Sequence, residues 1–274
     1  MKNKILIVYN PQKTNVVNLV KSISGQIKRK YATKVLINTC SSQKLTKKVC
    51  VADLILALGG DGTILKVAPY AVSYSIPVAG INIGGLGYLA EFKPHDVITI
   101  LEDFLTDKIK LQYRAVLDVV YKNKHYYALN DCVLKPLSSK VCNIELFIDG
   151  QKLTDIVGDG IIIATPTGST AYSLACGGSI VEPETDVLLI TPVSPHTLSI
   201  RPLIISPKKE VKLCIPVFKS NKKLFLSLDG QRNFFVKPLD EIFICLSDKK
   251  FLFIPNKRQS FFKILKQKLS WGKR

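Results

Sequence analysis

The chain has 274 residues, of which 47% are hydrophobic and 22% charged, and this length allows one large domain or two modest ones. No apolar run approaches the ~20 residues that a membrane-spanning helix needs, so the sequence predicts no such helix. The formal net charge of +18 attracts anions in general, but the lysines are spread along the whole chain and arginines are few, so the charge favours a solvated lysine-rich surface.

The chain begins with MKNKILIVYN, in which two lysines precede an apolar stretch as they do in a signal peptide. Residues 5–9 are too few for the apolar region of a signal peptide, and no small-residue cleavage site follows. We therefore interpret this stretch as a buried first strand and expect the protein in the cytoplasm.

Seven cysteines are scattered along the chain, at Cys40, Cys50, Cys132, Cys142, Cys176, Cys214 and Cys245. No pair has CxxC spacing, and no histidine stands near them at the spacing of metal ligands. An odd number without a framework indicates reduced thiols in a reducing compartment. We expect no structural zinc site and assign no residue as a metal ligand.

The first ninety residues alternate between strand and helix patterns. Apolar runs predict strands over 5–9, 34–37, 53–58 and 77–81, and apolar residues at helical spacing predict helices over 16–28, 45–51 and 63–72. Buried strands separated by helices form βαβ units with a parallel sheet covered on both faces. We expect residues 1–107 to form a Rossmann-like α/β domain.

Beyond about residue 108 short strand patterns follow one another closely, separated by turn signals such as DG. They are predicted over 115–122, 126–134, 143–149, 160–164, 187–191, 210–217, 224–228, 241–246 and 251–254. Many short strands at close spacing indicate a mainly antiparallel β domain, here over 108–255.

The C-terminal tail is amphipathic. In QSFFKILKQKL, residues 259–269, the side chains of Phe261, Phe262, Leu265 and Leu269 fall on one side of a helix. We expect a helix within 256–274 that returns to pack on the first domain.

The segment LILALGGDGTIL, residues 54–65, is an apolar strand that runs through glycines into a helix. Ligands of open α/β sheets bind at the carboxyl ends of strands, where helix N-termini offer free N–H groups, and glycines let the backbone approach a phosphate closely. We therefore expect Gly59, Gly60, Gly62 and Thr63 to cradle a phosphate, although the GK[ST] of a Walker A loop is missing.

Asp61 lies in the middle of this loop, where a carboxylate repels phosphate. Two roles outweigh that repulsion: Asp61 binds Mg²⁺, or it takes a proton from a hydroxyl group that attacks phosphorus. General base catalysis typically contributes about 10²–10⁴-fold. The pentapeptide alone equally allows a simple turn in which Asp61 caps the following helix.

A second segment, GDGIIIATPTGSTAYSLACGG, covers residues 158–178. A buried strand ends in hydroxyl-rich TPTGST at the start of a small-residue helix, and hydroxyls with free N–H groups suit phosphate or ribose. Small residues around Ala171 and Tyr172 leave room for a flat base. The alternative is a Ser/Thr-rich turn that only caps the helix.

Three further sites carry weaker signals. Asn130 and Asp131 end a strand, where an amide and a carboxylate can bind ribose hydroxyls or form a tight turn. His196 lies in PHTLSIRPL, and a lone histidine is more often structural than catalytic. Asp229 and Gly230 in LDGQ read first as a hairpin turn.

These motifs occur in a specific order that covers nearly the whole chain: GGDGT, INIGGLGYL (81–89), ALND, TPTGSTAYSLACGG, PHTLSIRPL, LDGQ and a terminal Leu-Ser-Trp-Gly. In this order they resemble bacterial NAD kinases, ATP- or polyphosphate-dependent enzymes that phosphorylate the adenosine-ribose 2′-hydroxyl of NAD. The TPTGSTAYSL segment is highly specific. GGDG is shared with diacylglycerol-type lipid kinases and phosphofructokinases, which lack TPTGSTAYSL and PHTLSIRPL.

The resemblance implies a fold, substrates and an assembly. It implies an N-terminal α/β domain, a C-terminal β domain, NAD bound between them, and a homo-oligomer, dimer or tetramer, in which a neighbouring subunit completes the pocket. NAD and ATP, or polyphosphate, would be the substrates, with Mg²⁺ as the divalent metal ion. We expect neither a nucleic-acid nor a membrane partner.

The resemblance also implies site residues. Asp61 would be the base that acts on the 2′-hydroxyl, with Gly62 against the ligand. The other residues that would bind NAD are Asn130, Asp131, Asp159, Thr167, Thr170, Ala171, Tyr172, Ser173, Leu174, Ala175 and Gln231. Further candidates are Lys66, Lys140 and His196.

The chain departs from the family pattern at three places. Asp131 stands where the family usually has Glu, which is one methylene longer. The following segment, KPLSSKVCN, is one residue short, and Val157 is apolar where enterobacterial-type members often carry a basic residue.

Two other functions remain open at this point. A lipid kinase of the diacylglycerol type would share the GGDG loop and would need an exposed apolar acceptor site. A non-catalytic nucleotide- or nucleic-acid-binding protein would use the positive charge, and its affinity for nucleic acid would fall steeply with salt.

Overall fold

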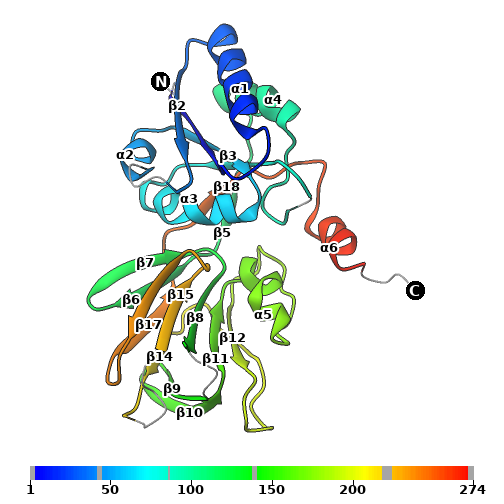
Figure 1. Ribbon diagram of the computed structural model, residues 1–274. Coiled ribbons are helices and arrows are strands. Elements are labelled where there is room, and N and C mark those ends of the chain that lie inside the picture. Colours follow the sequence, from blue (N-terminus) through cyan, green and yellow to red (C-terminus); the bar gives the residue numbers. More distant parts are fainter. Residues whose placement is uncertain (1–3, 42–44, 86, 138–140, 218–223, 271–274) are drawn as a thin grey trace. The chain divides into compact units, whose positions relative to one another are not determined.

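The computed structural model describes residues 4–41, 45–85, 87–137, 141–217 and 224–270 (Figure 1). The chain folds into two compact units. The first unit comprises Met1–Tyr113 together with Phe251–Arg274, and the second comprises Arg114–Lys250.

The first unit is built on a six-stranded sheet with the order β2-β1-β3-β4-β18-β5. Its strands are β2 (Lys34–Thr39), β1 (Lys4–Tyr9), β3 (Leu54–Gly59), β4 (Val78–Asn82), β18 (Phe251–Phe253) and β5 (Gln112–Arg114). The pairs β1–β2, β1–β3, β3–β4 and β4–β18 are parallel. Loops after β1, β3 and β4 therefore meet at one edge of the sheet.

Helices cover both faces of this sheet, which explains why its strands are apolar without alternation. Helices α1 (Val16–Lys30) and α4 (Val97–Leu105) share a core with Ile5, Leu56 and Ile81. Helix α3 (Asp61–Tyr74) lies on the opposite face, where its Ile64 packs against Gly80. The remaining helices are α2 (Leu45–Val49), the 3₁₀ turn η1 (Pro94–Asp96) and α6 (Phe261–Leu269).

The second unit contains two six-stranded antiparallel sheets. One has the order β10-β9-β14-β17-β6-β7, formed by Gln151–Gly158, Cys142–Ile148, Val211–Cys214, Glu241–Leu246, Leu117–Tyr121 and Lys124–Ala128. The other has the order β13-β12-β11-β8-β15-β16, formed by Leu203–Ile205, Leu188–Val193, Gly160–Ala164, Asp131–Pro136, Leu224–Leu228 and Arg232–Val236.

The main core of the second unit lies between these two sheets, because alternate residues of strands in both sheets belong to one buried cluster. Cys132 and Leu134 of β8 face this core, whereas Val133 faces a smaller cluster on the outer side. The segment with η2 (Thr167–Thr170) and α5 (Tyr172–Ala175) follows β11.

The predicted fold class is confirmed: a parallel α/β unit is followed by antiparallel sheets. The structure differs in detail. Helix α4 and strands β5, β10, β13 and β16 were not expected, and the pattern over 126–134 is interrupted at Leu129 and Asn130, where β7 ends and β8 begins. Strand β18 belongs to the parallel sheet, where Phe253 pairs with Val78 of β4, and not to the antiparallel sheets.

The tail helix also differs from its sequence pattern. Ile264 and Leu265 are buried, whereas Phe262 and Leu269 are largely exposed. The expected apolar face is therefore shifted by about one position around the helix. Among the described residues, no helix is both long and apolar enough to cross a membrane. All seven cysteines are free thiols.

Candidate functional site

Asp61 lies at the carboxyl end of β3, where the strand passes through Gly59 and Gly60 into α3. Gly60 is the N-cap of this helix, and Asp61 is its first residue. The hydrogen bonds that the carboxylate of Asp61 accepts come from residues 88–90 rather than from the first turn of α3. The simple capping role that the pentapeptide allowed is therefore not the one that this side chain takes.

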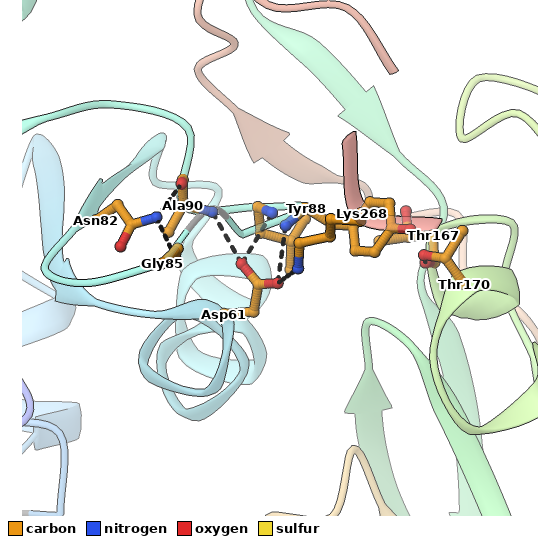
Figure 2. A network of polar contacts seen from close by, with 9 residues as sticks. Asp61, Asn82, Gly85, Tyr88, Ala90, Thr167, Thr170 and Lys268 are labelled. Atoms are coloured by element: carbon orange, nitrogen blue, oxygen red, sulfur yellow. Dashed lines mark hydrogen bonds and ion pairs between the residues drawn. The ribbon is translucent and has the colours of Figure 1, made fainter. Parts of the chain in front are cut away.

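The carboxylate of Asp61 instead binds the loop that follows β4. Its Oδ1 accepts hydrogen bonds from the backbone N–H groups of Leu89 (2.9 Å) and Ala90 (3.0 Å), and its Oδ2 accepts one from that of Tyr88 (2.9 Å) (Figure 2). The loop is closed by Asn82, whose Nδ2 donates to the carbonyl oxygens of Gly85 and Ala90. The GGDGT and INIGGLGYL motifs thus form one structure around Asp61.

Gly87 permits this close approach. A Cβ atom added at Gly87 would overlap Oδ1 of Asp61, whereas one added at Gly85 would meet no atom within 4 Å. The two glycines lie in the same loop, but only Gly87 is buried. The glycine at position 87 is therefore required by the contact with Asp61.

We expect Gly87→Ala to destabilise the protein by about 1–3 kcal/mol, because overpacking forces the loop or Asp61 to move. Gly85→Ala is the matched control, with an expected change within about 0.5 kcal/mol, as for other surface substitutions. Urea unfolding followed by circular dichroism measures both. Equal effects of the two variants would show that the loop does not depend on its contact with Asp61.

The other residues of the predicted phosphate cradle divide into two groups. Space is open around Gly60 and Gly62, where an added Cβ atom would meet nothing within 4 Å. Thr63 is buried and its hydroxyl lies against Gly59, with no hydrogen-bond partner among the described residues. Lys66 is half-buried further along α3.

A second cluster of predicted residues lies in the antiparallel unit, where β8 begins and β11 and β15 end. Because β8 is antiparallel to both neighbours, its Asp131 pairs with Ala164 at the end of β11, and Cys132 pairs with Leu228 at the end of β15. An open pocket of about 410 Å³ lies here. It is lined by Asn130, Asp131, Val133, Lys135, Ala171, Tyr172, Phe225, Ser227, Asp229, Gly230 and Asn233.

Asp229 holds residues 129–131, the corner between β7 and β8 at which this pocket lies. Its carboxylate accepts hydrogen bonds from the backbone N–H groups of Leu129 (2.8 Å), Asn130 (2.7 Å) and Asp131 (3.1 Å). The backbone of Asp229 itself turns at positive φ together with Gly230, as the DG pattern predicts. The side chain therefore does more than the turn requires, since it fixes the predicted site residues Asn130 and Asp131.

The TPTGST segment packs directly on the same corner. Thr165 donates from Oγ1 to the carbonyl oxygen of Leu129 (2.5 Å), and its backbone N–H donates to that of Asn130 (2.9 Å). Gly168 lies so close to Asn130 that an added Cβ atom would overlap its carbonyl group. Gly168 is therefore needed for contact between the two motifs.

Asp131 has the most unusual environment in this pocket. Only 5% of the residue is exposed, and its carboxyl group forms no hydrogen bond with any other part of the described chain. Burial, followed by the nearby charge of Asp229, raises the pKa of Asp131 to about 7. Burial also raises the pKa of Asp229, to about 6, although three backbone N–H groups favour its charged form. Asp131 is therefore the last of the pair to ionise.

This environment predicts how stability changes with pH. The native state holds a proton on Asp131 that the unfolded chain, with the ordinary pKa of 3.8, loses earlier, so native stability falls as pH rises from about 4 to about 7. Three pKa units correspond to about 4 kcal/mol at most. We expect the free energy of unfolding of Asp131→Asn, relative to the wild type, to rise across this interval in urea titrations. A difference that does not vary with pH would contradict the raised pKa.

The structure places the remaining predicted residues as follows. Tyr172 and Ala171 line the pocket, and Thr167 and Thr170 lie in the preceding η2 turn. The hydroxyl of Thr167 is buried without a partner in the described chain. Ser173 is fully buried and shares a hydrogen bond with Thr191 (2.8 Å), so its hydroxyl is used inside the fold.

Several predicted residues do not line this pocket. Leu174 and Ala175 follow in α5, Asp159 is exposed between β10 and β11, and Gln231 is exposed beyond the Asp229 turn. His196 is exposed, and its backbone N–H donates to the carbonyl oxygen of Val157. Lys140 lies outside the described residues.

Other pocket residues were not found from the sequence. Lys135 lies with its Nζ 5.9 Å from the centroid of the Tyr172 ring. Phe225 and Ser227 come from β15, whose pattern indicated only a strand, and Asn233 comes from β16, which the sequence did not predict. Phe225 and Ser227 alternate with the core residues Leu224, Leu226 and Leu228. This alternation was the signal in the sequence that they lie on the outward face of the sheet.

The described part of the chain contains no group of three or more His, Cys, Asp or Glu side chains that could hold a metal ion. Asp61 already accepts three backbone hydrogen bonds.

Known families match both units. Residues 44–109 match the model of the ATP-NAD kinase N-terminal domain, and residues 129–256 match that of the ATP-NAD kinase C-terminal domain. The NAD kinase of Aquifex aeolicus (strain VF5) is 41% identical over 226 residues, which are 80% of this chain and 82% of that protein. The NAD kinase of Fusobacterium nucleatum subsp. nucleatum is 32% identical over 271 residues, 98% of each chain.

Solved structures share the fold. The yeast NADH kinase complexed with NADH has a TM-score of 0.88 at 24% identity, over 99% of this chain and 89% of that one. An NAD kinase from Archaeoglobus fulgidus in complex with ATP has a TM-score of 0.74 at 22% identity, over 96% and 98%. The lipid kinase and non-catalytic alternatives receive no support from these relatives. The matches to both domain models, and the identity with curated relatives along most of the chain, show that this protein belongs to the NAD kinase family.

Proposed function

We propose that the protein phosphorylates the adenosine-ribose 2′-hydroxyl of NAD with ATP or another phosphoryl donor, and that Asp61 is the general base. Membership of the NAD kinase family supports the reaction. The observation that supports the residue assignment is the position of Asp61 at the carboxyl end of β3, beside open space at Gly60 and Gly62. Ligands of parallel sheets bind at this end of the strands.

For the dinucleotide we propose the pocket of the antiparallel unit. Asn130 and Asp131 offer an amide and a buried carboxyl group to ribose hydroxyls, and Tyr172 offers an aromatic ring to adenine. Asp131 supports this assignment best, since a buried carboxyl group without a partner in the described chain gains hydrogen bonds from a ligand. Thr167, Thr170, Asp159, Ser173, Leu174, Ala175 and Gln231 remain proposed contacts of the bound state.

In the proposed reaction Asp61 accepts the proton of the 2′-hydroxyl as its oxygen attacks the γ-phosphorus of ATP. Mg²⁺ is the proposed metal ion, held by phosphate oxygens of ATP, and it would supply positive charge to those oxygens. The backbone N–H groups of residues 88–90 keep the carboxylate of Asp61 oriented. Orientation of this kind lowers the cost of reaching the reactive geometry.

The test is NADP formation by the purified protein with NAD, ATP and Mg²⁺, followed through an NADP-specific dehydrogenase. NADP formation supports the proposal. Absence of NADP with ATP, with other triphosphates and with polyphosphate, using NAD or NADH as acceptor, would contradict it. We also propose that the protein is cytoplasmic and forms a homo-oligomer, either a dimer or a tetramer. Light scattering on the same sample tests the oligomeric state.

A further inference from the structure

Lys268 of the tail helix lies next to Asp61. Its Nζ is 3.9 Å from Oδ2 of Asp61 and 4.4 Å from the centroid of the Tyr88 ring (Figure 2). Asp61 and Lys268 are far apart in the sequence but belong to the same compact unit. Their side chains are 29% and 28% exposed, so the pair is accessible to a ligand.

Helix α6 holds Lys268 in this place. The hydroxyl of Ser260 accepts a hydrogen bond from the backbone N–H of Lys263 and so caps the start of the helix, while Ile264 and Leu265 are buried. Lys266 and Lys268 both lie in the last turn, where positive charge interacts favourably with the helix dipole. Stabilisation of the helix end therefore does not distinguish the two lysines, whereas the contact with Asp61 does.

The hydrogen bonds of Asp61 restrict where a proton can enter. A carboxylate has about four lone-pair positions, two on each oxygen. Both positions on Oδ1 are used, by the N–H groups of Leu89 and Ala90, and one on Oδ2 is used by that of Tyr88. The fourth position is on Oδ2, the oxygen that Lys268 faces. A hydroxyl that gives its proton to Asp61 must therefore approach beside the ammonium group of Lys268.

The ammonium group retains donors for a ligand. A separation of 3.9 Å is too long for a hydrogen bond, so Lys268 and Asp61 attract each other only as charges. Lysine has three N–H donors, and Lys268 donates no hydrogen bond to another described residue. The nearby ring of Tyr88 positions the cation without using a donor.

We propose that Lys268 binds the phosphoryl group in transfer and neutralises the negative charge that its oxygens carry. This role rests on the proposed function of Asp61. As the 2′-oxygen bonds to phosphorus, its proton passes to Oδ2 of Asp61, and the bond from phosphorus to the bridging oxygen breaks, so that ADP leaves with the electron pair. Lys268 keeps all its protons and donates N–H hydrogen bonds to the non-bridging oxygens.

The experiment compares Lys268→Met, Lys268→Arg and Lys266→Met in steady-state NADP formation, with thermal unfolding measured for each. We expect Lys268→Met to lower kcat by about 10–10³-fold, as loss of an electrostatic contact to a transition state does, with the KM for NAD within about threefold. Lys268→Arg should recover most of kcat because it keeps the charge. Lys266→Met should resemble the wild type, although it loses the same interaction with the helix dipole.

Other outcomes would overturn the proposal. A higher kcat in Lys268→Met would mean that the lysine restrains Asp61, and an unchanged kcat, or an equal loss in Lys266→Met, would leave Lys268 with a structural role only. Failure of the proposed function is a separate result, namely no NADP from the wild type with any donor. In that case calorimetric titration with ATP still tests the role of Lys268. The proposal requires that Lys268→Met binds ATP more weakly than Lys266→Met does.

Discussion

Asp61→Asn is expected to lower kcat for NADP formation by about 10²–10⁴-fold, the usual contribution of a general base, while NAD affinity changes little. The structure predicts a second effect of the same substitution. The amide NH₂ group of Asn has no lone pair to offer, so at least one of the backbone N–H groups of residues 88–90 loses its acceptor. We expect the free energy of unfolding to fall by about 1–3 kcal/mol as well.

The two effects are separated by Gly87→Ala, which disturbs the same loop but keeps the carboxylate. If Asp61 acts as a base, Asp61→Asn must lose far more kcat than Gly87→Ala at a comparable loss of stability. The measurements are steady-state kinetics, calorimetric NAD binding and urea unfolding on both variants. A kcat of Asp61→Asn within about threefold of that of Gly87→Ala would remove the base assignment and leave Asp61 as a residue that holds the loop.

The sequence predicted the position of Asp61 well, because an apolar run followed by glycines and a helical pattern has one common structural meaning. The parallel sheet followed from it, whereas α3 begins at Asp61, two residues before the predicted start at Thr63. The partners of the carboxylate did not, since Asp61 and residues 88–90 are joined by long-range contacts for which local periodicity gives no signal. Lys268 is further still along the chain, on a helix whose amphipathic pattern misplaced Phe262 and Leu269.

The TPTGSTAYSL segment marks a different limit. From its sequence, every residue from Thr170 to Ala175 was predicted to bind NAD, yet of these only Ala171 and Tyr172 line the pocket. Ser173 is buried against Thr191, and Gly168 is required by the close approach of Asn130. A motif therefore contains residues that build the site as well as residues that line it, and only the packing distinguishes the two.

Two Asp-Gly turns show most simply that a sequence motif does not predict where a side chain is buried. Asp149-Gly150 and Asp229-Gly230 both connect antiparallel strands, and all four residues have positive φ. Sequence pattern predicts the turn in both cases. The side chain of Asp149 lies at the surface, where it binds Lys209 and the backbone N–H of Glu210, whereas that of Asp229 is buried under Asn130. Burial follows from the partner strands, which the dipeptide does not specify.

Because the two turns match, they provide a controlled test of Asp229. We expect Asp229→Asn to lower the unfolding temperature clearly and to raise the KM for NAD at least tenfold, since the corner at residues 129–131 loses an acceptor for its N–H groups. Each buried donor left without a partner costs about 1–3 kcal/mol. Relief of the buried charge offsets part of this cost, because burial raises the pKa of Asp229 to about 6.

Because the charge of Asp229 is buried, the stability that Asp229→Asn loses relative to the wild type depends on pH in a defined direction. The native pKa lies above the ordinary value of 3.8, so ionisation of Asp229 lowers the stability of the wild type as pH rises through the interval from about 4 to about 6. Asp229→Asn lacks this contribution. The stability deficit of the variant should therefore be largest near pH 4 and smaller at pH 8, in thermal or urea unfolding. Asp149→Asn, at an exposed turn of the same conformation, should change stability little at either pH. If both variants behave alike, the buried carboxylate does not hold residues 129–131, and the backbone turn and the TPTGST segment position Asn130 and Asp131 without it.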